Sequence, residues 1–132
     1  MINFELDQEQ KMLTDAIGRL AEERIRKVFR EADEEGTLPA EVVQAGWEMG
    51  VLPTSIPEEY GGFGEYSVMT GVLATEAFAY GDLATTLNIM VPNLVAVPLI
   101  LAGTDAQKEA HLPLFCEEGL PQVTAALTEP VI

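Results

Sequence analysis

The stretch that decides the fold is residues 7–36, DQEQKMLTDAIGRLAEERIRKVFREADEEG. Its apolar side chains recur at spacings of three and four, which places them along one stripe of an amphipathic helix. Asp7 and Gln10 have the spacing of a capping box at its start, and Gly36 suits the left-handed residue that ends many helices. The stripe consists of Met12, Leu13, Ala16, Ile17, Leu20, Ala21, Ile25, Val28, Phe29 and Ala32. A helix with one such stripe has to bury it against further elements.

The rest of the chain predicts four more helices, which makes the fold class all-α, a bundle of about five helices. The second helix covers about residues 39–50, with its proline in the first turn, and the third covers about 66–80. The fourth begins near Leu83 and has to kink or break around Pro92, because proline removes a backbone hydrogen bond and clashes one turn back. The fifth covers about 104–117 and opens with a second capping box.

A loop rich in proline and glycine separates the second helix from the third. Its breakers are Pro53, Pro57, Gly61, Gly62 and Gly64. Proline and glycine restrict the backbone in different ways, so this density predicts a tight and specific path. Glu58 and Glu59 are adjacent and have no evident third ligand, which favours a structural turn over a metal or catalytic site. We expect Tyr60 and Phe63 to anchor the loop by packing.

The charge of the chain is strongly acidic and unevenly distributed. Its 132 residues carry 22 acidic and 7 basic side chains, for a formal net charge of −15. Such a surface repels phosphodiesters, which argues against nucleic acid and against a basic membrane-surface role. Residues 1–66 hold 15 acids and 6 bases, whereas 67–132 hold 7 acids and 1 base. We therefore expect a solvated front half and a back half that meets other surfaces.

An uncharged run of 22 residues extends from Leu83 to Thr104. Its length could span a bilayer, but its prolines, its polar residues and its acidic flanks favour burial against other protein. The first five residues show neither a basic nor an apolar signal-peptide region. We therefore expect no membrane span, no secretory signal and a cytoplasmic location.

The residues that most often carry chemistry are scarce. Cys116 and His111 are the only cysteine and histidine, and they lack the ligand spacing of a zinc site. We expect Cys116 to be a half-buried apolar residue and His111 to be a solvated helix residue. The chain also lacks a GxSxG, a Walker and a GxGxxG motif. These residues predict no metal site.

The last part of the chain differs from the helical part. Residues 122–128, QVTAALT, are uncharged and compatible with a β-strand. One strand has no sheet to join, so we expect residues 1–120 to form a helical domain and 121–132 to begin a truncated middle β domain.

Three motifs in order resemble one family. They are PEEYGGFG at 57–64, LAGTDAQK at 101–108 and ALTEP at 126–130, and the opening Phe4-x-Leu6-x-x-Glu9-Gln10-x-x-Leu13 fits the same family. Together they look like the amino-terminal helical domain of FAD-dependent acyl-CoA dehydrogenases. The resemblance implies a three-domain enzyme, commonly a tetramer, that desaturates an acyl-CoA thioester between its α- and β-carbons. Its catalytic glutamate lies in the third domain, so we expect no catalytic residue in this chain and no activity from it alone.

The resemblance also implies two sites. The fourth helix would form the wall of the fatty-acyl pocket, placing Thr86, Leu87, Met90 and Leu94 along the tail of the substrate. An apolar face suits a hydrocarbon tail, which gains about 0.8 kcal/mol per buried CH₂ group. The alternative is that these four residues simply pack the helix core.

The second implied site lies at the flavin, where Ala125, Leu127 and Thr128 match cofactor-binding positions of the family. The alternative for Thr128 is an ordinary threonine at a strand end. The family continues with a Gly-Ser-Asp signature, which does not occur before the sequence ends at Val131-Ile132. We therefore expect FAD in the full-length enzyme but no binding of FAD by this chain alone. The implied partners are an acyl-CoA substrate and an electron-transfer flavoprotein or a similar acceptor.

Two other readings stay open. One is a non-catalytic acidic helical interaction module that docks through the weakly charged region 67–104. The other keeps the fold but changes the chemistry to that of an acyl-CoA oxidase or a flavin-dependent hydroxylase. Because the CoA phosphates are anionic and this chain is acidic, we expect the CoA head to lie against other domains.

Overall fold

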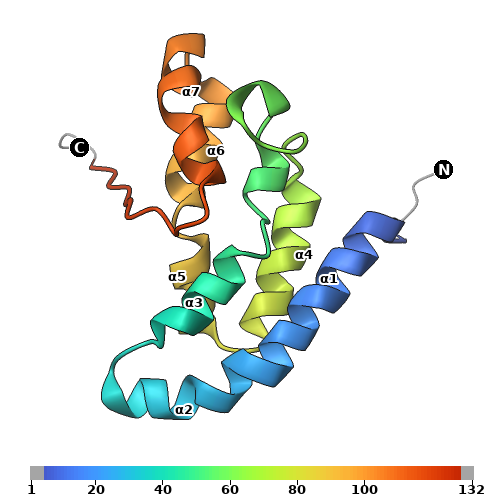
Figure 1. Cartoon of the computed structure of the whole chain (residues 1–132), viewed down its shortest axis with the longest axis vertical. Helices are drawn as coiled ribbons and strands as arrows, with labels where there is room; N and C mark the ends of the chain where they lie inside the picture. The colour runs from blue at the N-terminus through green and yellow to red at the C-terminus, as the bar shows by residue number, and fades with distance from the viewer. Residues whose placement is uncertain (1–4, 129–132) are drawn as a thin grey trace.

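A computed structural model of the chain describes residues 5–128, which form a helical bundle (Figure 1). The α-helices are α1 (Gln8–Leu20), α2 (Arg26–Glu35), α3 (Ala40–Trp47), α4 (Val68–Ala79), α5 (Leu83–Met90), α6 (Asn93–Ala102) and α7 (Asp105–His111). A π-helical turn, Ala21–Ile25, joins α1 to α2, and 3-10 turns cover Pro53–Ser55, Glu58–Tyr60 and Leu112–Cys116. The all-α prediction is confirmed, with α1–α2 and α5–α6 each corresponding to one predicted helix.

The ends of the first helix follow the local signals in the sequence. The Asp7 side chain accepts from the Gln10 backbone N–H at 2.8 Å, and the Asp7 N–H donates to Gln10 Oε1 at 3.1 Å. Gly36 ends α2 with a φ of 66°, in the left-handed region. The π-helical turn between α1 and α2 was not predicted, because neither proline nor glycine marks it.

The apolar stripe of the first helix packs on the bundle, as predicted. Ile17, Ala21 and Ile25 are fully buried, and they pack in one cluster with Phe78 of α4 and Val42 of α3. A second cluster gathers Trp47, Leu52, Ile56, Ala96, Leu112 and Phe115. The predicted stripe is too wide at two positions, since Met12 and Phe29 are exposed.

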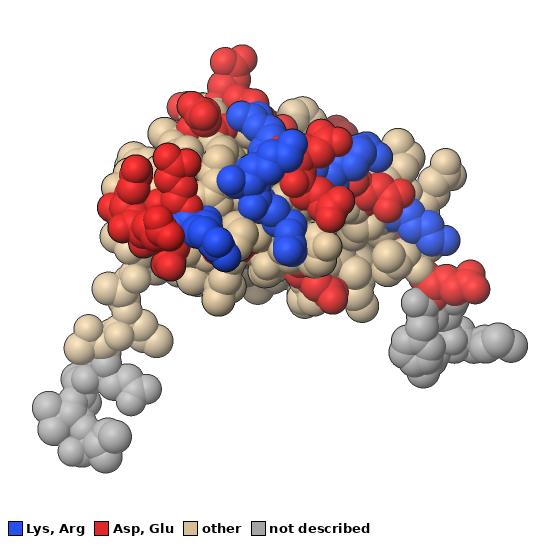
Figure 2. Space-filling view, turned by 90° about the horizontal axis from the view of Figure 1, so that it is seen from below, with Lys and Arg blue, Asp and Glu red and all other residues tan. Residues whose placement is uncertain are grey.

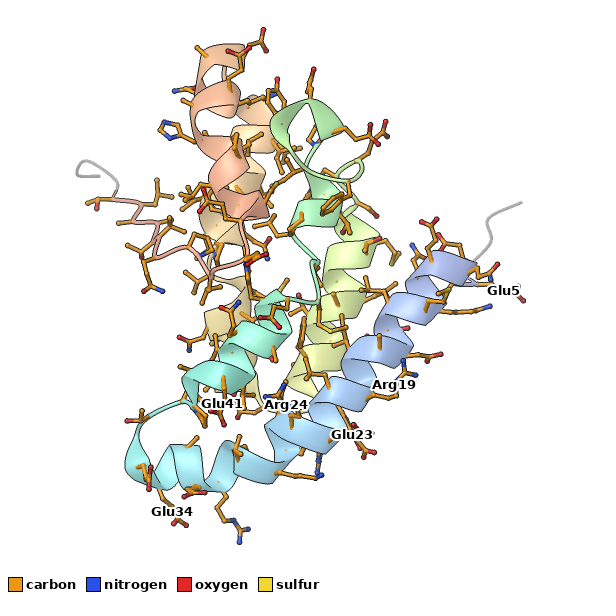
Figure 3. The ribbon with its side chains drawn as sticks, in the orientation of Figure 1. Glu5, Arg19, Glu23, Arg24, Glu34 and Glu41 are labelled. Atoms are coloured by element: carbon orange, nitrogen blue, oxygen red, sulfur yellow. The ribbon has the colours of Figure 1, made fainter. Side chains whose placement is uncertain are left out.

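The opposite face of the first helix is covered by charges of both signs. Viewed from below, basic side chains form a band with acidic ones on both sides (Figure 2). Glu23 and Glu34 point away from the bundle (Figure 3). Arg26 lies 4.8 Å from the centre of the Tyr80 ring and donates to the Tyr80 carbonyl at 3.0 Å. An exposed cation–π contact contributes only about 0.5–1 kcal/mol, so this face is mainly a solvated surface.

The uncharged run breaks at Pro92, as predicted. The break separates α5 from α6, and the two helices are bent by 42°. Within residues 5–128 no single helix is long and apolar enough to cross a membrane; only this bent pair meets that requirement by length and composition. One face of the pair is buried, through Thr85, Thr86, Ile89, Pro92 and Ala96.

The proline- and glycine-rich loop follows the tight path that was predicted. Gly61 has a φ of 89°, and a Cβ on Gly62 would overlap the carbonyl of Ile56. Tyr60 packs against the second cluster, but Phe63 is 71% exposed, so its predicted role as an anchor is wrong. Backbone hydrogen bonds hold this part of the loop instead, because the Phe63 N–H donates to the Pro53 carbonyl at 3.0 Å.

The predicted strand is not formed over residues 122–128, which are coil: Val123 packs against the second cluster, and the chain then runs away from the bundle (Figure 1). A strand needs a neighbour for its backbone groups, and residues 5–128 contain no other strand. Just before this coil the chain is fastened to α3. The Gln44 amide donates to the Glu118 carbonyl at 2.7 Å, and the Trp47 indole donates to the Glu117 carbonyl at 3.2 Å.

Candidate substrate cavity

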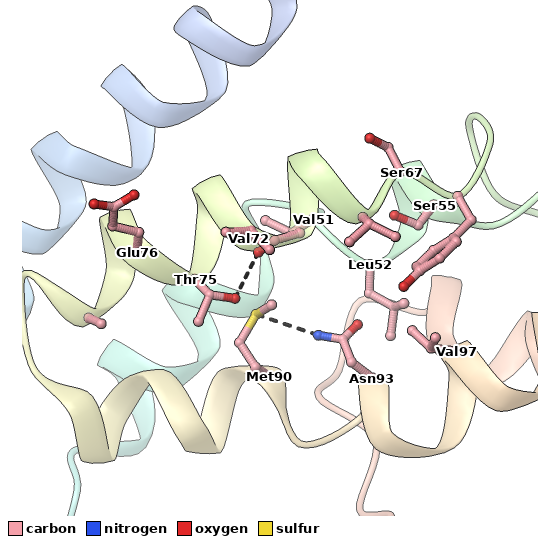
Figure 4. Close-up of a pocket in the computed structure, with 14 residues that line it drawn as sticks. Val51, Leu52, Ser55, Ser67, Val72, Thr75, Glu76, Met90, Asn93 and Val97 are labelled. Carbon is pink, nitrogen blue, oxygen red and sulfur yellow. Dashed lines mark hydrogen bonds between the residues drawn. The ribbon is translucent and has the colours of Figure 1, made fainter. Parts of the chain in front are cut away.

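An apolar cavity of about 490 Å³ lies between α4 and the junction of α5 with α6 (Figure 4). Val72 of α4, Met90 of α5 and Val97 of α6 contribute to its walls. Val51 and Leu52, which precede the first 3-10 turn, add a third side. Three segments that are distant in the sequence thus line one open, mainly aliphatic hollow, which suits a hydrocarbon chain.

Several polar groups around this cavity already have partners. The Asn93 amide donates to Met90 Sδ at 3.6 Å, and Thr75 Oγ1 donates to the Gly71 carbonyl at 2.8 Å (Figure 4). Ser67 caps the start of α4 by accepting from the Thr70 N–H at 3.2 Å. Glu76 is the only carboxylate that lines the cavity, and no lysine, arginine or histidine among the described residues lines it.

The four residues predicted for the acyl tail lie in different places. Met90 lines the cavity. Thr86 is buried, and its hydroxyl donates to the Asp82 carbonyl at 2.7 Å, so it packs inside the helix core. Leu87 and Leu94 are both largely exposed. Contact with a substrate tail stays a prediction for all four.

A second groove, of about 640 Å³, brings the two predicted sites together. It runs along α6 and the 3-10 turn after α7, and residues 123–126 form one of its sides. Leu94 and Ala125, predicted separately for the acyl tail and the flavin, both line it. His111 also borders this groove, although its own surface is exposed.

The predicted flavin segment is open to solvent. Leu127 is 95% exposed, and Ala125 and Thr128 are exposed as well. The backbone groups of residues 124–128 make no hydrogen bond to any other described residue. These backbone groups can therefore form hydrogen bonds with a ligand or another strand. The described part of the chain could contact a flavin ring along this segment only and does not surround it.

The remaining reactive groups do not form a site. Burial raises the pKa of the Cys116 thiol, which keeps it protonated and weakly nucleophilic. Partial burial, followed by the Glu59 and Asp105 carboxylates, raises the pKa of Tyr60. No group of three or more His, Cys, Asp or Glu side chains within residues 5–128 could hold a metal ion.

Sequence reasoning missed most of the residues that line the cavity. Ser55, Tyr66, Val72 and Asn93 line it, yet none was a candidate. The cavity exists only where the first 3-10 turn, α4 and the α5–α6 junction meet. A sequence pattern within one helix could not indicate such a meeting.

Comparison with known proteins identifies the family. Residues 7–119 match the family described as "Acyl-CoA dehydrogenase, N-terminal domain". The (2S)-methylsuccinyl-CoA dehydrogenase of Cereibacter sphaeroides is 41% identical over 95% of this chain and 23% of its own length. A probable medium-chain specific mitochondrial acyl-CoA dehydrogenase of Caenorhabditis briggsae is 31% identical over 98% of this chain and 31% of its own length.

A solved structure agrees with the sequence relatives. Butyryl-CoA dehydrogenase from Megasphaera elsdenii superposes with a TM-score of 0.78 and 26% identity, over 89% of this chain and 31% of that one. The chain thus spans about a third or less of each of these three proteins. The family match and the shared helical fold show that this chain belongs to the acyl-CoA dehydrogenase family and forms its N-terminal domain.

Proposed function

We propose that this chain forms the acyl-tail side of the substrate site of an FAD-dependent acyl-CoA dehydrogenase, which desaturates an acyl-CoA thioester between its α- and β-carbons. The observation that carries the proposal is the aliphatic cavity between α4 and the α5–α6 junction. Met90 borders that cavity and is also a residue that the family resemblance assigns to the acyl tail. Its flexible thioether can adapt to tails of different shape.

Burial of the tail can account for useful binding energy. Each CH₂ group moved from water into the cavity contributes about 0.8 kcal/mol, so a six-carbon tail gains about 5 kcal/mol before the entropy of binding is subtracted. The CoA head needs cations for its phosphates, and none of the described residues in the walls of this cavity is cationic. We therefore place the CoA head on other domains of the enzyme, and only the tail on this one.

The oxidising chemistry belongs to FAD, which members of this family use. Residues 125–128 would contribute one edge of its site through their open backbone groups. Because the described residues offer no enclosure for the ring, we expect this chain alone to be inactive and to bind no flavin. A tetrameric full-length enzyme, a cytoplasmic location and an electron-transfer flavoprotein or similar acceptor are part of the same proposal.

A titration with octanoyl-CoA tests the proposal on the chain itself. The chain is labelled with ¹³C at its methionine methyl groups, and the NMR signals are followed. We expect the Met90 signal to shift, whereas Met12, which is exposed on α1, should not respond. Free CoA should leave both signals unchanged. A Met90 shift with free CoA, or no Met90 shift with octanoyl-CoA, would contradict the proposal.

A non-catalytic interaction module is the second candidate. It is favoured by the exposed apolar residues on α4 and α5, which are Val68, Met69, Val72, Leu83 and Leu87. An interaction module would bind octanoyl-CoA no better than free CoA in the titration above. An oxidase or hydroxylase of the same fold would bind it, and oxygen consumption by the full-length enzyme would then separate these from a dehydrogenase.

A further inference from the structure

One end of the α4 cavity carries hydroxyl groups that have no partner. Ser55 and Tyr66 both line the cavity there, beside Ser67. Ser55 is only 7% exposed, and Tyr66 is half-buried. Neither side-chain hydroxyl makes a hydrogen bond to any described residue, whereas Thr75 in the same cavity donates to the Gly71 carbonyl.

The Ser55 hydroxyl faces solvent-accessible space and is not sealed inside the protein core. No side-chain oxygen or nitrogen among the described residues is fully buried without a partner, so Ser55 Oγ keeps contact with solvent-accessible space. Figure 4 shows Ser55 and Ser67 at the end of the cavity opposite Glu76. A hydroxyl that faces such a space without a protein partner is free to bond a ligand oxygen in place of water, and a hydrogen bond of this kind contributes about 0.5–1.5 kcal/mol net.

The charges around the cavity indicate which polar ligand fits. Glu76 lies at the far end, and no cationic side chain from residues 5–128 lines the cavity. Ser55 and Ser67 also border a neighbouring hollow beside the start of α1, whose lining includes Asp7, Glu9 and Glu65. Carboxylates thus line both the far end of the cavity and the hollow next to its hydroxyl end, and no cation among the described residues lines either, which disfavours a ligand carboxylate. A neutral oxygen meets the same hydroxyls without repulsion.

We infer that this site prefers acyl groups whose tail carries a neutral oxygen, as an alcohol or a ketone, over plain alkyl tails and over tails that end in a carboxylate. The inference rests on the proposed function, because it assumes that the acyl tail occupies this cavity. Ser55 and Tyr66 are the residues that determine the preference, and the aliphatic walls hold the rest of the chain.

Four thioesters of N-acetylcysteamine test the preference. They carry a hexanoyl group, its terminal-alcohol analogue, its methyl-ketone analogue and its terminal-carboxylate analogue. Dissociation constants are measured on the 132-residue chain from the Met90 methyl signal. We expect the alcohol or the ketone to bind roughly three- to tenfold more tightly than hexanoyl, and the carboxylate to bind most weakly.

Single variants locate the effect. Ser55→Ala and Tyr66→Phe should each reduce the preference for the oxygenated tail, taken as the ratio of its dissociation constant to that of hexanoyl in the same variant, by about threefold. Thr75→Val is the matched control, because it removes a hydroxyl from the same cavity that already has a partner. It should leave the preference intact. Thermal unfolding of each variant checks that the fold is retained. If either Ser55→Ala or Tyr66→Phe does not fold, the other is sufficient for the test.

The outcomes separate this inference from the proposed function. If hexanoyl and the oxygenated tails bind equally, or if the preference survives both variants, the inference is wrong while the proposed function stands. If no thioester shifts the Met90 signal, the proposed function fails and the inference fails with it. Tightest binding of the carboxylate would overturn the charge argument directly.

Discussion

Individual residues in the 53–64 loop hold the chain in a path that other side chains cannot follow. Gly62 lies so close to the Ile56 carbonyl that a Cβ would overlap it, and a Cβ on Gly64 would come within 2.6 Å of the Thr54 carbonyl. The sequence predicted the tight path, because proline and glycine act locally. It did not predict the exposure of Phe63, which depends on what the rest of the fold places nearby.

Substitution of Gly62 by alanine should destabilise the protein. The added methyl group meets a backbone carbonyl that cannot move aside, and overpacking of this kind costs about 2–3 kcal/mol of unfolding free energy. Gly18→Ala in α1 is the control, because a Cβ at that position would meet nothing within 4 Å. Alanine there should raise the free energy of unfolding by about 1 kcal/mol, since it favours the helix more than glycine does. Urea unfolding measures both; equal effects of the two variants would contradict the steric argument.

The Cys116 thiol should react more slowly with iodoacetamide than a free cysteine at neutral pH. Its pKa is raised by burial, so the fraction present as thiolate is smaller at any pH below that pKa. The reaction rate, measured by mass spectrometry against pH, should therefore rise at higher pH than it does for a model thiol. If the rate rises at the same pH as it does for the model thiol, or at a lower pH, burial does not raise the pKa of Cys116.

At the scale of elements, helix ends were predictable and helix partners were not. The capping boxes at Asp7 and Thr104 and the break at Pro92 are encoded by neighbouring residues. The π-helical turn before α2 carries no such local signal, and Ile25 at its end lies against Gly81, 56 positions away. The cavity likewise depends on residues that are distant in the sequence. Met90 was a candidate through family resemblance, whereas Ser55 and Tyr66 become neighbours only after the bundle forms.

The contact between α3 and the segment after Cys116 should depend on hydrogen bonds more than on packing. Gln44 donates to the Glu118 carbonyl and accepts from the Leu120 N–H, at 2.7 and 3.4 Å. Gln44→Met keeps the volume but removes both bonds, so amide exchange of Leu120 should accelerate by roughly tenfold, as expected for about 1.4 kcal/mol. Gln122→Met, at an exposed position, is the control. If the exchange rate of the Leu120 amide is unchanged in Gln44→Met, packing and not these hydrogen bonds holds the segment against α3.

For the molecule as a whole, the distribution of charge was more informative than its total. The acidic front half lies mainly on solvated helices, whereas the uncharged run supplies one wall of the cavity and a row of exposed leucines on α5 and α6. The fold class followed from helical periodicity, and the family from three motifs in order. The domain assignment of residues 121–132 stays a prediction, and residues 129–132 lie outside the described part of the structure.

Exposed apolar faces should make the isolated chain associate in solution. Leu83, Leu87, Leu94 and Leu101 are each about 60% exposed, and apolar surface of this kind favours contact with another surface. Light scattering should give a mass above 14.3 kDa that falls when Leu87 and Leu94 are both changed to glutamate. Met12→Glu, which removes an exposed apolar residue from α1, is the control. A monomer at all concentrations would contradict this expectation.

The central claim is that the acyl tail of an acyl-CoA occupies the cavity between α4 and the α5–α6 junction. The most direct test is the set of NOEs between the acyl protons of bound octanoyl-CoA and the methyl groups of the protein. The claim predicts NOEs from the tail to Met90, Val72 and Val97, which line the cavity. NOEs confined to methyl groups elsewhere, such as Met12 of α1, would contradict it.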